Sequence, residues 1–220
     1  MRRPLSTFAL LFALLLAAPA QYRDQPWSER DQWARPSEVL DALGLKPGSA
    51  VADIGAGPGY FTFKLAERVG SDGKVLAVDV NEDAVRELRQ KLADAGLKQV
   101  QVILSAPEDP KLPPESLDAA LVVNAYHEFR EHDRMLQAIR RALKPGGVLG
   151  IIDKAAAAGH ERSYYEERHE LPQSFVRDDL AHNGFGNVRE QNGFDPTSPS
   201  RRGEHWWFLV AAKAPPPAAQ

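Results

Sequence analysis

Asp53 is followed by three glycines at alternate positions: Gly55, Gly57 and Gly59. Glycines let the backbone bend sharply and let a ligand come within contact distance, because a Cβ would clash there. An apolar run at 50–54 precedes them and predicts a buried strand, and an amphipathic helical pattern follows. The start of such a helix offers unpaired N–H groups and a weakly positive end. The stretch therefore predicts a strand, loop and helix that hold a nucleotide-like ligand.

The spacing of the glycines separates two kinds of ligand. A dinucleotide loop has the pattern Gly-x-Gly-x-x-Gly, but Tyr60 stands at the place of its third glycine. The carboxylate of Asp53 would also repel a pyrophosphate, whereas it suits a ligand with positively charged groups. A nicotinamide oxidoreductase is therefore disfavoured.

A second acidic residue, Asp79, ends the next predicted strand at 74–79. An acidic side chain at this place can accept hydrogen bonds from both hydroxyls of a ribose. The alternative is that Asp79 caps the following helix, a role for which Asn81 is better placed. We therefore expect Asp79 to bind the sugar of the ligand.

Strands and helices alternate along most of the chain. Strands are predicted at 50–54, 74–79, 100–104, 117–123 and 148–152, and helices at 36–43, 59–69, from 82 to about 95 and before Lys144. A further helix at 173–183 is followed by two strands at 186–191 and 205–212. The order predicts one α/β domain with a mostly parallel sheet covered on both faces.

Three further motifs are Lys46-Pro47-Gly48, Asn124 to Phe129 and Lys144-Pro145-Gly146-Gly147. Together with the glycine loop after Asp53 and with Asp79, they resemble the motifs of the class I S-adenosylmethionine-dependent methyltransferases. The resemblance covers residues 36–154 and continues more loosely to Lys213. It is greatest to small-molecule enzymes of the quinone-biosynthesis type and to bacterial predicted methyltransferases with a Tyr-His-Glu run. It implies a doubly wound, seven-stranded Rossmann-like sheet with a C-terminal antiparallel hairpin.

The resemblance also implies S-adenosylmethionine as cofactor and in-line methyl transfer to a small-molecule acceptor. The alternative is an exported, non-catalytic binding module that keeps the fold. Carried over to this chain, the cofactor-binding residues are Asp53, Gly55, Ala56, Gly57, Gly59, Tyr60, Asp79, Val80, Ala106, Pro107, Glu108, Asn124 and Ala125. Ala106 stands where many relatives carry an aspartate, so adenine recognition falls to the backbone near Ala106 and Pro107, or to Glu108 or Asp109.

Three side chains are candidates for acid–base chemistry at the acceptor: His127, His169 and Glu128. His127 is also readily explained as a histidine satisfied by its neighbours. His127 and His132 resemble a zinc-binding pair, which needs two histidines four residues apart on a helix. Here they are five residues apart, so the second ring would point about 140° away from the first. No metal site is predicted.

Composition limits the remaining choices. The chain has 220 residues, a formal charge of −3, no cysteine and no basic run, so one domain is expected and nucleic acid is not an expected partner.

Residues 1–20 have the layout of a signal peptide, which predicts a periplasmic or secreted protein without stable membrane insertion. An uncleaved N-terminal anchor is the alternative. We expect a lead-in or lid at residues 21–35. The resemblance implies that residues 36–213 are the methyltransferase domain, and we expect residues 214–220 to be a disordered tail rich in proline and alanine. The oligomeric state is open.

Overall fold

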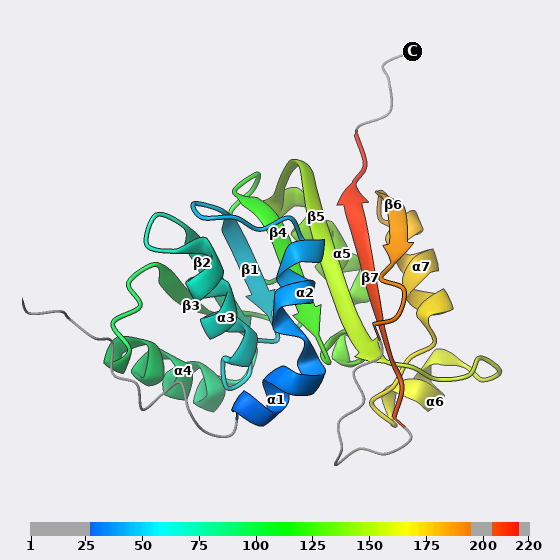
Figure 1. Cartoon of the computed structure of the whole chain (residues 1–220). Coiled ribbons are helices and arrows are strands. Elements are labelled where there is room, and N and C mark those ends of the chain that lie inside the picture. The colour runs from blue at the N-terminus through cyan, green and yellow to red at the C-terminus, as the bar shows by residue number, and fades with distance from the viewer. Residues whose placement is uncertain (1–26, 195–203, 216–220) are drawn as a thin grey trace, which may run out of the picture.

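The structure is a computed structural model that describes residues 27–194 and 204–215 (Figure 1). Its described part contains a seven-stranded sheet in the order β3-β2-β1-β4-β5-β7-β6. The strands are β1 (Ala50–Ile54), β2 (Lys74–Asp79), β3 (Val100–Leu104), β4 (Leu117–Val123), β5 (Leu143–Lys154), β6 (Phe185–Glu190) and β7 (Trp206–Lys213). β1 to β5 are parallel, whereas β7 is antiparallel to both β5 and β6. The predicted doubly wound sheet and its closing hairpin are confirmed.

Helices cover both faces of this sheet (Figure 1). Side chains of α2 (Pro36–Ala42) and α3 (Tyr60–Val69) pack on the face that includes Val51 and Val75. Side chains of α5 (His132–Ala142) and α7 (Gln173–His182) pack on the opposite face, with Ala52 and Leu76. Neighbouring strand residues point to opposite faces, so these continuous apolar strands build two core layers at once.

α4 (Glu82–Asp94) begins at the predicted cap. The side-chain oxygen of Asn81 accepts hydrogen bonds from the backbone N–H groups of Asp83 and Ala84, at 2.9 and 3.1 Å. These bonds satisfy two of the donors that a helix start leaves unpaired. Asn81 therefore caps the helix, which leaves Asp79 available for the loop beside it.

Three segments differ from the sequence prediction. β5 begins at Leu143, five residues before the predicted strand, but its register with β4 shifts after Leu143 and regular pairing resumes at Val148, where the strand was predicted. The lead-in contains a helix, α1 (Trp27–Ala34), and the loop predicted at 155–170 contains α6 (Arg162–Glu166). These two helices are short, and neither carries a long amphipathic pattern that periodicity could detect.

Several predictions fall outside the described residues. They include the signal peptide at 1–20, the lead-in up to residue 26 and most of the tail from 216 onward. Determining the first residue of the purified chain would test the signal peptide, with Gln21 expected. Among the described residues, no helix has both the length and the apolar character that crossing a membrane requires.

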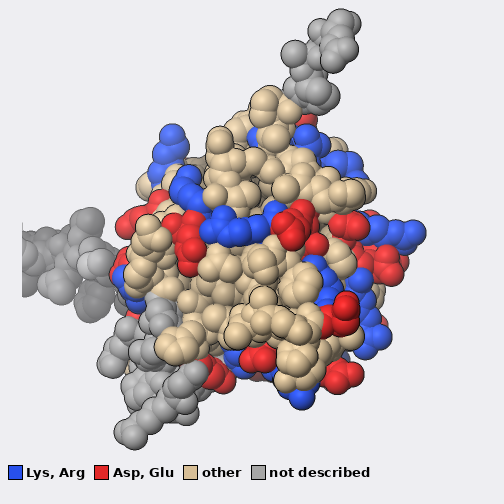
Figure 2. Space-filling view, turned by 90° about the vertical axis from the view of Figure 1, so that its right-hand side faces the viewer, with Lys and Arg blue, Asp and Glu red and all other residues tan. Residues whose placement is uncertain are grey.

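The surface on the side of β6 and α7 carries charges of both signs. Figure 2 shows basic and acidic side chains interspersed over this face with uncharged surface between them. Such a mixed surface produces no large field of one sign on this side of the molecule.

Candidate active site

A cavity of about 360 Å³ lies at the carboxyl ends of β1, β2 and β4. Its size falls within the range of roughly 300–1,000 Å³ that is usual for small-molecule sites. Its lining includes many of the predicted residues: Asp53, Gly55, Ala56, Gly57, Tyr60, Asp79, Val80, Pro107, Asn124, Ala125 and Glu128. Parallel strands that end together bring these distant segments to one edge of the sheet.

The glycine loop is held against β2 by backbone hydrogen bonds. The N–H groups of Gly55 and Ala56 both donate to the carbonyl oxygen of Val78, at 2.9 and 3.0 Å. Gly55 has a φ of 75°, and a Cβ added to it would lie 2.6 Å from the Cβ of Ala125. Gly55 is therefore required both by its left-handed backbone and by the close approach of the loop after β4.

Replacing Gly55 with alanine should destabilise the fold by about 1–3 kcal/mol, because it combines overpacking with a strained φ. Urea unfolding of the wild type and variant measures this loss. The double variant Gly55→Ala/Ala125→Gly should recover part of it, since it removes the clashing methyl group but keeps the strained φ. Gly96→Ala, whose added Cβ meets nothing within 4 Å at a φ of 68°, is the matched control for strain alone. Equal losses for Gly55→Ala and Gly96→Ala would contradict the role of the contact with Ala125.

Asp79 holds the glycine loop from the end of β2. Its Oδ2 accepts a hydrogen bond from the N–H of Gly57 at 2.7 Å, and its Oδ1 accepts one from the N–H of Asn81 at 2.9 Å. An ionised carboxylate has about four acceptor positions. Asp79 can therefore position the loop and still accept hydrogen bonds from a ligand in the cavity.

Asp53 is a buried carboxyl group at the end of β1. It is 3% exposed, and its Oδ2 accepts a hydrogen bond from the hydroxyl of Thr62 at 2.6 Å. Burial raises the pKa of Asp53 to about 6, although the bond from Thr62 and the charge of Arg30 oppose this effect. A positively charged ligand in the cavity would offset the cost of ionising this group.

Asn124 lies directly after β4 and lines the same cavity. Its φ is 54°, a conformation that few residues other than glycine adopt. Its side-chain oxygen is buried and has no hydrogen-bond partner among the described residues. A buried acceptor without a partner is costly, so this atom fits a ligand that brings an N–H donor into the cavity.

α1 lies over one wall of the cavity. The hydroxyl of Tyr60 donates a hydrogen bond to Oδ1 of Asp31 at 2.6 Å, and Lys64 binds the other oxygen of Asp31 at 2.5 Å. The guanidinium of Arg30 lies 4.0 Å from the centre of the Tyr60 ring and also lines the cavity. Part of the segment predicted as a lead-in or lid is thus a helix anchored to the first turn of α3, and Arg30 is a residue of the cavity lining that the sequence prediction missed.

Eight more lining residues were not predicted: Ile54, Pro58, Phe61, Val78, Ser105, Val123, Phe129 and Met135. Ser105 follows β3 directly, a position that the argument from strand ends could have identified. Three predicted residues lie outside the lining. Gly59 caps α3, Ala106 pairs with Asp109, and Glu108 is an exposed residue of that turn.

His127 and His169 also lie outside the lining, next to Glu128. His127 belongs to η2 (Tyr126–Glu128), and its Nδ1 lies 2.8 Å from Oδ1 of Asp153, a fully buried residue of β5. Its Nε2 is 3.7 Å from a carboxylate oxygen of Glu128. Burial disfavours the imidazolium, but the bond to Asp153 and the charges of both carboxylates outweigh it and raise the pKa of His127 to about 9. His127 is therefore charged at neutral pH, which is unfavourable for a general base.

The fold and the position of the cavity are those of a class of α/β proteins, the enzymes that bind a nucleotide cofactor at the carboxyl ends of the strands. A family model described as a methyltransferase domain matches residues 51–147. The ubiquinone/menaquinone biosynthesis C-methyltransferase UbiE of Hydrogenovibrio crunogenus is 31% identical over 122 residues, which are 55% of this chain and 47% of the relative. The chain thus aligns with about half the length of the curated relatives it matches.

Solved structures agree with this assignment. An S-adenosylmethionine-dependent methyltransferase from Aquifex aeolicus has a TM-score of 0.70 and 28% identity, with 88% of this chain and 96% of that chain covered. The phosphoethanolamine N-methyltransferase 2 of Haemonchus contortus, in complex with S-adenosylmethionine, shares the fold at 18% identity and a TM-score of 0.67, covering 83% and 53% of the two chains. The comparisons therefore support the predicted resemblance: residues 51–147 match a methyltransferase domain, and the chain is similar to S-adenosylmethionine-dependent methyltransferases in sequence and fold.

Proposed function

We propose that this protein binds S-adenosylmethionine in the cavity and transfers its methyl group to a small-molecule acceptor. The observation that carries the proposal is the pair of buried acceptors in the lining of the cavity. They are the carboxyl group of Asp53 and the unpartnered side-chain oxygen of Asn124. Together they suit a ligand with a positively charged, hydrogen-bond-donating group, such as the ammonium of S-adenosylmethionine.

The other lining residues fit the rest of that cofactor. The carboxylate of Asp79 has acceptor positions left for ribose hydroxyls. Val80 is 54% exposed, a large apolar side chain that lines the cavity next to Asp79, and Pro107 adds a second apolar surface. Both offer contact area for a planar base such as adenine.

When bound, the cofactor supplies a methyl group that its sulfonium already activates. What the chain must add is orientation and exclusion of water. Arg30 of α1 lines the cavity, and the hydrogen bond from Tyr60 to Asp31 helps to hold α1 in place beside it. Glu128 lines the cavity, and its interaction with His127 lowers its pKa, so its carboxylate is ionised at neutral pH. Glu128 is therefore better suited than His127 to orient an acceptor there by accepting a hydrogen bond from it.

A ligand titration of the full chain tests the cofactor half of the proposal. S-adenosylmethionine and S-adenosylhomocysteine should each raise the melting temperature, whereas NAD should not. A ligand at a hundredfold its dissociation constant adds about 2.7 kcal/mol to stability. Asp79→Asn should reduce the shift, and the exposed Asp72→Asn is the matched control. No shift with either adenosyl ligand would overturn the proposal.

The acceptor half needs a second assay. Incubation with S-adenosylmethionine labelled in its methyl group, followed by mass spectrometry of pooled quinols, phenols, hydroxy acids and amines, should show one labelled class. The alternative is an exported binding module, motivated by the signal-peptide layout of residues 1–20. Cofactor binding without transfer to any acceptor would favour that alternative.

A further inference from the structure

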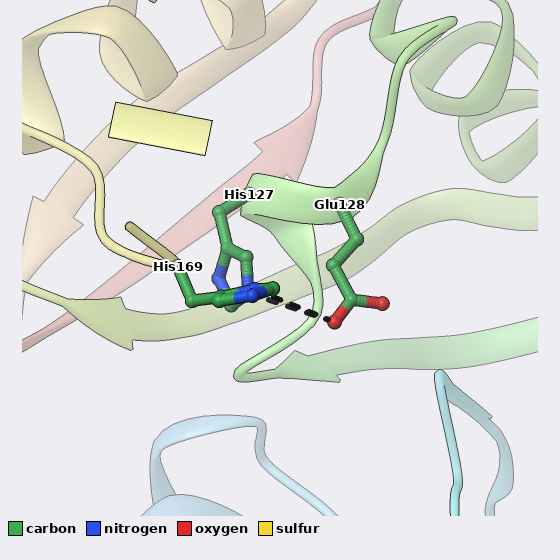
Figure 3. Close-up of side chains that lie close together, drawn as sticks. All are labelled: His127, Glu128 and His169. Atoms are coloured by element: carbon green, nitrogen blue, oxygen red, sulfur yellow. Dashed lines mark ion pairs between the residues drawn. The ribbon is translucent and has the colours of Figure 1, made fainter. Parts of the chain in front are cut away.

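Three side chains meet at the rim of the cavity. His127 and Glu128 extend from η2, and His169 reaches the same point from the segment between α6 and α7 (Figure 3). The carboxylate of Glu128 lies 3.7 Å from Nε2 of His127 and 3.9 Å from Nδ1 of His169. One nitrogen or oxygen atom from each residue lies within 4.8 Å of the other two. Two imidazole nitrogens and a carboxylate oxygen therefore converge on one point.

The buried member of this cluster lacks a hydrogen bond where the three meet. The side chain of His127 is 1% exposed, and its Nε2 has no hydrogen-bond partner among the described residues. Its other nitrogen is bound to Asp153 at 2.8 Å, which orients the ring. Histidines that bind metals have this arrangement, with one nitrogen held by a carboxylate and the other directed at the ion.

We propose that His127, Glu128 and His169 bind one divalent transition-metal ion, with Asp153 as the residue that positions His127. Zinc is bound at about 2.0–2.2 Å by histidine and carboxylate ligands, so the separations between the three ligating atoms must shrink by up to about 1.5 Å. Glu128 and His169 are 62% and 63% exposed, which gives them the freedom to make this movement. Two nitrogens with one oxygen favour zinc, cobalt or iron over magnesium or calcium.

The backbone also favours the cluster. His169 has a φ of 53°, a conformation that is uncommon for residues other than glycine. In this position its ring meets that of His127 edge to face, with centroids 5.2 Å apart. The spacing between His127 and His132 already spoke against a helical pair of zinc ligands, and in the structure His132 lies in α5 with its Nε2 3.5 Å from Asp179.

Three protein ligands leave at least one position of the ion open to another molecule. Glu128 also lines the cavity, so an ion bound to it would lie beside the place proposed for an acceptor. A metal ion lowers the pKa of an oxygen bound to it, which suits an acceptor with a hydroxyl group. This choice of acceptor class rests on the proposed methyl transfer, whereas the metal site does not.

Cobalt binding to the full chain tests the site without any enzyme assay. After removal of metals with a chelator, one equivalent of Co²⁺ should produce the visible absorption of a four- or five-coordinate ion, and Zn²⁺ should displace it. His169→Ala should weaken binding by about 100-fold or more, since second-shell changes alone cost 10–100-fold. His182→Ala, a change of an exposed histidine at the end of α7, should leave binding unchanged.

Two further variants keep the test decisive. Glu128→Gln changes an exposed side chain and should weaken binding while circular dichroism stays that of the wild type; Asp153→Asn should weaken it by 10–100-fold. Absence of stoichiometric binding, or wild-type binding by a folded His169→Ala, would overturn the metal site. Cofactor titration in the presence of the chelator separates the two proposals, because metal binding and S-adenosylmethionine binding can then fail independently.

Discussion

Replacing Asp153 with alanine should lower the free energy of unfolding by about 3–5 kcal/mol at neutral pH. Asp153 is fully buried, and its two carboxylate oxygens accept from the backbone N–H of His127 at 3.1 Å and contact its ring nitrogen at 2.8 Å. Its removal leaves a buried imidazole that must either lose its proton or stay charged without its main partner. Urea unfolding measures the loss, and Asp83→Ala, on the exposed face of α4, is the control.

The pH dependence identifies the cause of this loss. The pKa of His127 is raised from 6.5 to about 9 in the folded protein. A group whose folded pKa is raised contributes stability that is fully present below the unfolded value and is lost as pH rises through the folded value. Between pH 6.5 and 9 the wild type, freed of metal by a chelator, should therefore lose about 3 kcal/mol, and Asp153→Ala should lose much less. An equal pH slope in both proteins would contradict the charged pair.

Replacing Asp53 with asparagine should change stability and cofactor affinity in opposite directions. Burial raises the pKa of Asp53 from 3.8 to about 6, so keeping it ionised at neutral pH costs the folded state up to about 3 kcal/mol. Asparagine has a similar shape, can still accept the hydrogen bond from Thr62 and carries no charge. The variant should therefore unfold at a higher temperature than the wild type at pH 7.

The same change should weaken S-adenosylmethionine binding by about 10–100-fold, since a hydrogen bond to a charged group contributes about 1.5–3 kcal/mol. In the wild type, affinity measured by calorimetry should rise with pH through about 6 as Asp53 ionises; in Asp53→Asn it should stay flat. Asp72→Asn is the control for loss of a surface charge. A variant that binds as tightly as the wild type would show that Asp53 does not contact the cationic part of the cofactor.

Short-range patterns determined most of the frame of this protein. Alternation of buried strands and amphipathic helices predicted the sheet, because burial on both faces requires continuous apolar strands. The glycine spacing after Asp53 and the cap at Asn81 are requirements of the local backbone, so they can be read from neighbouring residues. Asp79 was also identifiable from the sequence, because it ends a predicted parallel strand and the carboxyl ends of such strands form the ligand site.

The remaining features of the site depend on packing between segments far apart in the chain. Arg30 reaches the cavity only because α1 packs on Tyr60, and Asp153 meets His127 only because β5 lies beside β4. His169 joins them from a separate loop. The sequence by itself determined the strands and the glycine loop, because these follow from local backbone needs and periodicity. Only the tertiary structure decided which histidine and which carboxylate meet, because those contacts depend on how loops pack at the sheet edge.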